Sequence, residues 1–232
     1  IRDSVASRGL GDVYKRQVMY RNFIAGASPR GIGVGYPEFV NVCFDANALN
    51  LIMVWHGAFM DGAKHWNGRG QGFQPPLGHY LVSVKRAQAI AQLPNAKAPW
   101  PELKTGNNDD DRAKGLRFRG YKLVEGQRPV FRYSAGETMI EDYVIPQGGP
   151  LPSYTRRITF SGSGKYYYLA GTDSSIEQVG DDTWKIGKTL KVTLDASAEP
   201  VLRDGPDGKE LLVPVDVKGK AVIRARYEWD LN

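Results

Sequence analysis

The sequence has very little cysteine, since Cys43 is the only one among 232 residues. It therefore has no internal disulfide, no CxxCH haem attachment and no cysteine-based zinc site. Long apolar runs are also missing, and none approaches the roughly 20 residues that a membrane helix needs. These absences exclude a disulfide framework, a c-type cytochrome and a membrane-spanning helix for this chain.

The first seventeen residues, IRDSVASRGLGDVYKRQ, lack an apolar face of helical or strand period. No apolar run of a secretion signal follows their basic positions. The stretch resembles translated sequencing-adaptor read-through, so we exclude residues 1–17 from the fold as a non-native tail. We then expect the gene to be cut at Val18, with any signal peptide and upstream domain lost.

The net charge gives no sign of a nucleic-acid partner. Four basic and two acidic residues in the tail contribute +2 to the total of +6, which leaves +4 for residues 18–232. Such a mildly basic domain is no nucleic-acid binder by charge alone.

Glycine and aromatic residues are abundant, with 27 Gly, 8 Phe, 5 Trp and 12 Tyr. This balance favours short strands and many turns. FVNVCFD and LNLIMVWHGAF, separated by a turn, predict a hairpin in which Cys43 lies on one face as a buried structural thiol, with Val42 and Phe44 on the other.

The second half alternates more regularly and predicts an antiparallel meander that starts at Leu116. HYLVSVKRAQAIAQLP predicts a short helix or a strand followed by a helix. We therefore predict an all-β chain: residues 18–232 form one large antiparallel β-sandwich with long loops, at most one or two short helices and a possible subdivision near residue 115.

Three motifs resemble parts of functional sites, but none of them is sufficient to assign a site. GIGVGYP contains G-x-G-x-G, yet Pro37 lies where the helix of a dinucleotide site would begin, so the glycines indicate close strand packing. His56, His65 and Asp61 match no local metal signature, and His79 lies on a different segment. An acid/base role for Asp61, Glu141 or Asp142 needs a carboxylate separation that sequence does not show. We assign no catalytic residue, metal or cofactor.

The candidate binding residues fall in two groups. Trp55, Trp66 and Arg69 come from one Gly-rich segment that offers the stacking faces and planar donors of a sugar site. The alternative is that the tryptophans anchor the core, and this suits Trp55, which follows the apolar run LIMV, better than Trp66. Arg117, Arg119 and Tyr121 share a strand face by period 2, opposite Phe118, and either dock a neighbouring domain or form a solvated face.

A family resemblance covers most of residues 28–146. Its motifs are Phe44-Asp45-Ala46, Trp55-His56-Gly57-Ala58-Phe59-Met60-Asp61, Trp66-Asn67-Gly68-Arg69-Gly70 and Arg117-Phe118-Arg119-Gly120-Tyr121. This order resembles a domain of large secreted proteins from Planctomycetes and Verrucomicrobia that join sugar-dehydrogenase-like propellers or other modules to a c-type cytochrome. The resemblance implies a periplasmic or extracellular location and a cytochrome-like neighbouring domain, whereas the missing haem motif prevents electron transfer from being carried over.

Two functions follow from these residues. The first is a non-catalytic accessory module that binds carbohydrate or docks a neighbouring domain of a larger secreted redox or carbohydrate-active protein. The second is a carbohydrate-active enzyme with its cleft in the 55–73 loop, which would require two carboxylates in an open cleft.

Overall fold

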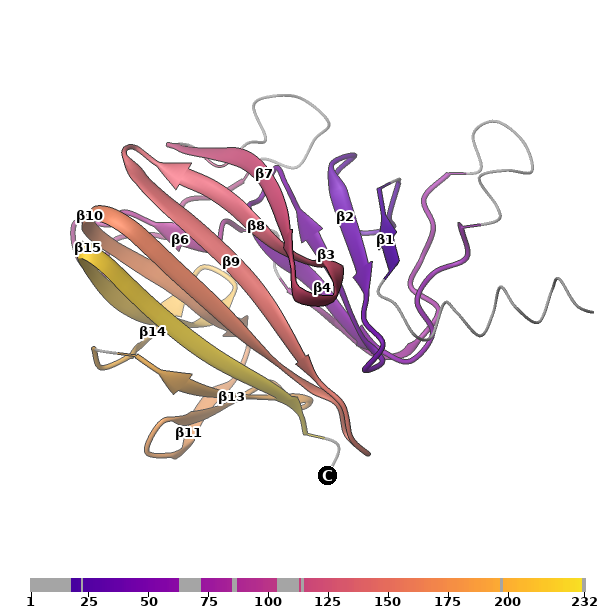
Figure 1. The fold of residues 1–232 in the computed structure, drawn as a ribbon. Coiled ribbons are helices and arrows are strands. Elements are labelled where there is room, and N and C mark those ends of the chain that lie inside the picture. Colours follow the sequence, from indigo (N-terminus) through magenta and orange to yellow (C-terminus); the bar gives the residue numbers. More distant parts are fainter. Residues whose placement is uncertain are drawn as a thin grey trace, which may run out of the picture.

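The structure is a computed structural model that describes residues 18–21, 23–62, 72–84, 87–103, 113, 115–196 and 198–230. These residues form two antiparallel sheets and no α-helix, with one turn of 3-10 helix, η3 (Glu125–Gln127). The sheets face each other across a shared hydrophobic core (Figure 1). The predicted all-β, sandwich-like class is confirmed. Within the described ranges, no helix is long and apolar enough to cross a membrane.

The smaller sheet contains five strands in sequence order. They are β1 (Val18–Tyr20), β2 (Gly31–Gly35), β3 (Val40–Asp45), β4 (Asn50–His56) and β5 (His79–Ser83). The predicted hairpin is present as β3 and β4. Val42 and Phe44 face the core shared with the larger sheet, whereas Cys43 packs in a second cluster with Trp55, as the alternation predicted.

The glycines of β2 permit close packing rather than nucleotide binding. A Cβ on Gly35 would lie 2.9 Å from the ring of Phe59, and one on Gly33 would lie 3.1 Å from the same ring. Only glycine allows Phe59 to lie directly on this strand.

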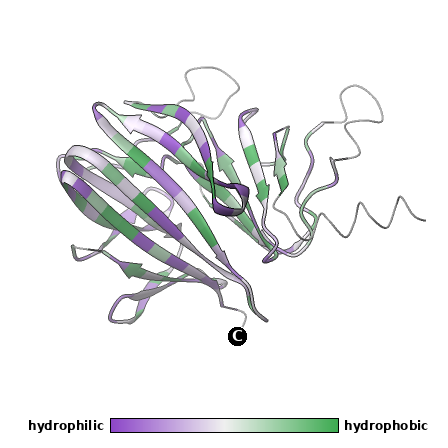
Figure 2. Ribbon diagram, in the orientation of Figure 1, coloured by the Kyte–Doolittle hydropathy of each residue, from purple (hydrophilic) through white to green (hydrophobic). Residues whose placement is uncertain are grey.

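The larger sheet contains ten strands, with its main path in the order β11-β12-β13-β15-β10-β9-β8-β7. The strands are β6 (Ile90–Ala91), β7 (Leu116–Val124), β8 (Arg128–Ala135), β9 (Thr138–Gln147), β10 (Ser153–Asp173), β11 (Ile176–Gly180), β12 (Thr183–Ile186), β13 (Leu190–Asp195), β14 (Val201–Gly205) and β15 (Gly208–Trp229). β14 pairs with β15, and β6 pairs with β10. Hydrophobic and hydrophilic residues alternate along the strands, as Figure 2 shows, which gives the sheet one buried and one exposed face.

The centre of the larger sheet is the long antiparallel pair of β10 and β15 (Figure 1). Its register runs from Ser153 opposite Glu228 to Asp173 opposite Lys209. The intervening strands fold back, so that β13 pairs with one end of β15 and β14 with the other. This pair therefore organises most of the second half of the chain.

The helix predicted within HYLVSVKRAQAIAQLP is wrong for the described residues of that segment. His79–Ser83 is strand β5, which pairs with β4, and Ile90–Ala91 is strand β6, which pairs with β10. Tertiary pairing of these short runs overrides the weak helix propensity of the Ala- and Gln-rich stretch between them.

A charged network lies in the core where the sheets meet. Arg156 on β10 and Asp142 on β9 both face inward, and the Arg156 Nε donates to the carboxylate at 2.9 Å. The Arg156 Nη1 donates across the core to Oδ1 of Asn50 on β4 at 2.8 Å. The Asn50 amide nitrogen in turn donates to the Ala87 carbonyl at 2.8 Å. The network thus links both sheets and the segment that precedes β6.

Burial makes this network costly to disrupt. The Arg156 side chain is 5% exposed and that of Asp142 is 0% exposed. The guanidinium also lies over the Tyr168 ring, 5.5 Å from its centroid. A buried charge that loses its partner keeps its desolvation penalty, so removal of one member destabilises strongly.

We predict that Arg156→Met lowers the free energy of unfolding by about 3–5 kcal/mol, because it leaves the Asp142 carboxylate buried without its counter-ion. The double variant Arg156→Met/Asp142→Leu should lose less, since it removes both charges. Urea unfolding of the variants measures this order. A double variant that is less stable than Arg156→Met would contradict it.

Cys43 offers a second test of the core. Its thiol is buried, and burial followed by the nearby Asp45 carboxylate raises the thiol pKa far above its usual range. The thiol therefore stays protonated and inaccessible. We expect no reaction with a thiol reagent at pH 8 until the chain unfolds, and prompt labelling of the native protein would show that this face of β3 is open.

Candidate functional site

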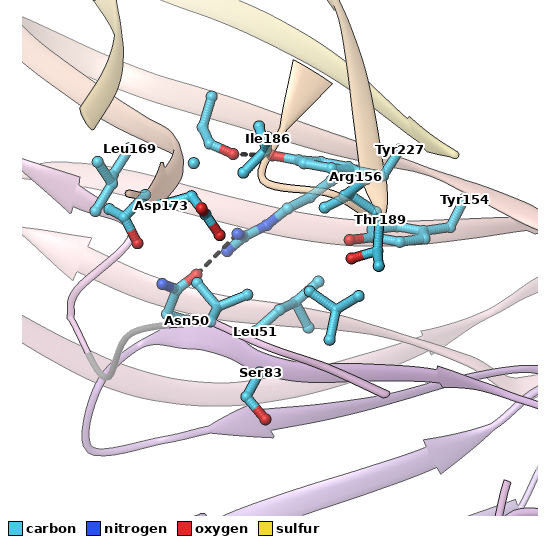
Figure 3. A pocket seen from close by; sticks show the side chains of 16 residues that line it. Asn50, Leu51, Ser83, Tyr154, Arg156, Leu169, Asp173, Ile186, Thr189 and Tyr227 are labelled. Atoms are coloured by element: carbon cyan, nitrogen blue, oxygen red, sulfur yellow. Dashed lines mark hydrogen bonds between the residues drawn. The ribbon is translucent and has the colours of Figure 1, made fainter. Parts of the chain in front are cut away.

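A cavity lies between the sheets, next to the charged network (Figure 3). Its walls come from β4 and β5 of the smaller sheet and from β10, β12, β13 and β15 of the larger one. Its volume is about 70 Å³, and the hollow opens to solvent at its mouth. This is below the roughly 300–1,000 Å³ of sites that enclose a drug-sized ligand, so the cavity has room only for part of a ligand that enters through the open mouth.

Polar groups in the depth of the cavity come from Arg156 and Asn50, which meet there in the bond already described (Figure 3). Side chains of Leu51, Leu169, Ile186 and Leu190 supply the apolar part of the lining. A mainly apolar wall with a few fixed polar groups is the usual composition of a small-ligand site.

Two tyrosines add aromatic surface to the cavity. The rings of Tyr154 and Tyr227 stack with centroids 4.9 Å apart and an interplanar angle of 12°. The Tyr227 hydroxyl donates to the Ala170 carbonyl at 2.8 Å, so Tyr168 donates in the 2.6 Å contact between the two hydroxyls. Tyr227 is thus fixed by its neighbours.

The Tyr154 hydroxyl differs from that of Tyr227. It makes no hydrogen bond with any residue that the structure describes, although its side chain lines the cavity. Burial raises the pKa of Tyr154, with a smaller contribution from Tyr168, so the hydroxyl stays neutral. It remains able to donate and to accept one hydrogen bond to a ligand.

The mouth of the cavity carries short polar side chains. Ser83, Thr172, Asp173 and Thr189 lie there, and each is partly or fully exposed. The Asp173 carboxylate accepts a hydrogen bond from the Ser175 backbone N–H at 3.2 Å, which holds its position. The mouth therefore offers hydroxyl groups and one carboxylate acceptor.

Among the described residues, Asp142, Tyr154 and Glu141 are not arranged as an acid/base pair. The buried carboxylate of the network, Asp142, is paired with Arg156, and the raised pKa of Tyr154 keeps it from acting as a base near neutral pH. Glu141, the neighbour of Asp142, lies on the opposite face of β9 and pairs with Lys122 at 2.7 Å. Glu141 and Asp142 therefore do not act together.

Of the three binding residues predicted in the Gly-rich segment, Trp55 lies in the core, and the structure does not describe the other two. Trp55 is 0% exposed, stacks on Phe59 with centroids 5.8 Å apart, and donates its indole N–H to the Ala58 carbonyl. It is a core residue, the alternative that the preceding apolar run favoured, and it does not reach a ligand. Trp66 and Arg69 lie outside the described residues, as do residues 63–71 of the 55–73 loop that an enzyme cleft would need.

The predicted stripe of Arg117, Arg119 and Tyr121 on one strand face is wrong. A register shift between Phe118 and Tyr121, with Gly120 at φ 90°, inserts an extra residue into β7. Tyr121 therefore turns to the core side with Phe118, while both arginines stay exposed.

The two arginines still share a groove. They line it together with Arg30 and Asn47, and no acidic side chain belongs to its described lining. The Arg119 Nε donates to Ser134 at 3.0 Å, whereas Arg117 has no partner among the described residues. Such a groove suits an acidic partner surface.

The cavity residues come from strands distant in sequence, so no local motif such as the aromatic loop marks them. A signal was present in the strands themselves. In TMIEDYVI, Asp142 is the one charged residue on the face of Ile140 and Val144, and in SYTRRITF, Arg156 is the one on the face of Tyr154 and Ile158. Single opposite charges on the apolar faces of adjacent strands predict a buried pair.

Trp55→Ala should lower the free energy of unfolding by about 3–5 kcal/mol, because it opens a large cavity in the core beneath β4. Leu151→Ala is the matched control, since Leu151 is 56% exposed and its truncation should cost less than about 0.5 kcal/mol. Chemical unfolding of both variants checks this. Similar stabilities for the two would place Trp55 outside the core.

Comparison with known proteins gives one partial match. The family model described as "Domain of unknown function (DUF6797)" matches residues 42–142. No curated protein and no solved structure matches the chain. The matched segment runs from β3 into β9 and ends at Asp142, so it contains one half of the buried ion pair and the arginines of β7, but not Tyr154 or Arg156. Residues 42–142 of this chain are thus similar to DUF6797.

Proposed function

We propose that this chain is a non-catalytic β-sandwich module that binds a neutral carbohydrate at the open mouth of the cavity between its sheets, with one edge of the sugar entering the hollow. The observation that carries the proposal is the unpartnered Tyr154 hydroxyl in a cavity walled by stacked tyrosines, leucines and the fixed Arg156. Sugars combine apolar ring faces with hydroxyl groups that donate and accept. A wall of aromatic surface with a few fixed polar groups is complementary to both.

The charge of the cavity favours a neutral ligand. Arg156 is already neutralised by Asp142, and the Asp173 carboxylate at the mouth would repel an anion. Hydroxyl groups of a sugar would donate to Asp173 and accept from the Tyr154 hydroxyl without bringing a charge into the core.

We place the module in a larger secreted protein, in the periplasm or outside the cell, beside a redox or carbohydrate-active domain that includes a cytochrome-like module. The support is the order of the motifs from Phe44 to Tyr121, together with the exposed Arg117 and Arg119 of the groove. In this arrangement the two arginines dock an acidic surface of the neighbouring domain.

Tyr154→Phe tests the proposed site, because it removes the hydroxyl and leaves the ring. We expect affinity for a monosaccharide or short glycan, found by screening a glycan array and measured by calorimetry, to fall about three- to tenfold. Tyr143→Phe is the matched control, since Tyr143 lies on the outer face of β9, and it should bind as the unchanged protein does.

Three results would overturn the proposal. One is that no glycan binds the unchanged chain, and another is that Tyr154→Phe and Tyr143→Phe bind equally well. The third is that Trp66→Ala abolishes glycan binding while Tyr154→Phe does not, which would return the site to the aromatic loop.

A further inference from the structure

We propose that His56 and His79 together bind a divalent transition-metal ion such as Zn²⁺ or Cu²⁺. The two residues belong to neither the cavity nor the arginine groove. The proposal is therefore independent of carbohydrate binding, and either one can fail alone.

The sheet register brings the two histidines together. They are far apart in sequence, yet β4 and β5 pair with His56 directly opposite His79. Directly opposite residues on regular antiparallel strands have Cβ atoms about 4.5–5.5 Å apart and project to the same side of the sheet, and here a register shift lies between Val54 and His56. The ring centroids of both histidines lie 6.4 Å from that of Tyr80.

Both imidazoles are available as ligands. Neither makes a hydrogen bond or an ion pair with any residue that the structure describes. His79 is exposed and His56 is half-buried, so a solvated ion can reach them and the His79 ring can turn toward it.

The backbone segments that carry the two histidines pack closely against each other. A Cβ on Gly78 would lie 2.0 Å from the His56 carbonyl oxygen, so only glycine lets the chain enter β5 this close to β4. The Trp229 indole N–H donates to the Tyr80 carbonyl at 2.8 Å and ties the start of β5 to the end of β15. The spacing of the two histidines is thus set by packing and not by the ligand.

The chemistry of the pair limits what it binds. Imidazole nitrogen suits Zn²⁺, Cu²⁺ and Ni²⁺, whereas Ca²⁺ and Mg²⁺ prefer oxygen. No group of three or more His, Cys, Asp or Glu side chains is placed to hold a metal within the described ranges. Water would therefore complete the coordination, and the ion would be weakly held and exchangeable.

The chain itself provides the matched control, because it contains only three histidines. The full chain, prepared without a histidine tag, is titrated with Zn²⁺ in a calorimeter and with Cu²⁺ under electron paramagnetic resonance. His79→Asn changes an exposed side chain and should leave the fold intact by circular dichroism. His65→Asn removes the histidine that takes no part in the pair.

We expect one ion per chain, hyperfine structure from two nitrogens, and an affinity that falls at least about tenfold in His79→Asn and in His56→Asn, because each loses the chelate. His65→Asn should bind as the unchanged chain does. The proposal is wrong if neither ion binds, if His79→Asn binds as tightly as the unchanged chain, or if His65→Asn weakens binding as much as His79→Asn.

Discussion

The fold depends on how it accommodates one buried guanidinium. Arg156 faces the interior of the larger sheet, where an uncompensated cation would cost several kcal/mol. Asp142 on the adjacent strand neutralises its charge, and Asn50 on the opposite sheet accepts a hydrogen bond from its Nη1. Hydrophobic burial is non-directional and would tolerate many alignments of two sheets, whereas these hydrogen bonds require one. The network therefore specifies the alignment of the sandwich as well as contributing to its stability.

The same residue lines the cavity between the sheets. The guanidinium of Arg156 and the Asn50 amide that it contacts belong to the lining of the cavity, together with Tyr154 and Asp173. Under the proposed function, a hollow whose polar groups are already held by hydrogen bonds would reduce the entropy lost on binding. Binding at this place would connect the ligand to both sheets at once.

Much of the fold could be predicted from the sequence. Alternation identified the hairpin of β3 and β4, the opposite faces of Cys43 and Phe44, and the meander after Leu116, because period 2 reports directly on which face of a strand is buried. Long-range pairing was not predictable. Because of it, the stretch from His79 forms short strands, and His79 lies opposite His56. The bulge in β7 that turns Tyr121 to the core was not predictable either. The cavity was not predicted for the same reason, since its walls come from six strands that are distant in sequence. The isolated charges Asp142 and Arg156 were the one indication of it in the sequence.

The central claim is that Arg156 couples the two sheets through Asn50, and a double-mutant cycle tests it most directly. The free energy of unfolding is measured for the unchanged chain, Asn50→Ala, Arg156→Met and the double variant. A hydrogen bond to a buried charged group should give a coupling energy of about 1.5–3 kcal/mol. A coupling energy near zero would show that the sheets hold their alignment without this contact, and would contradict the account.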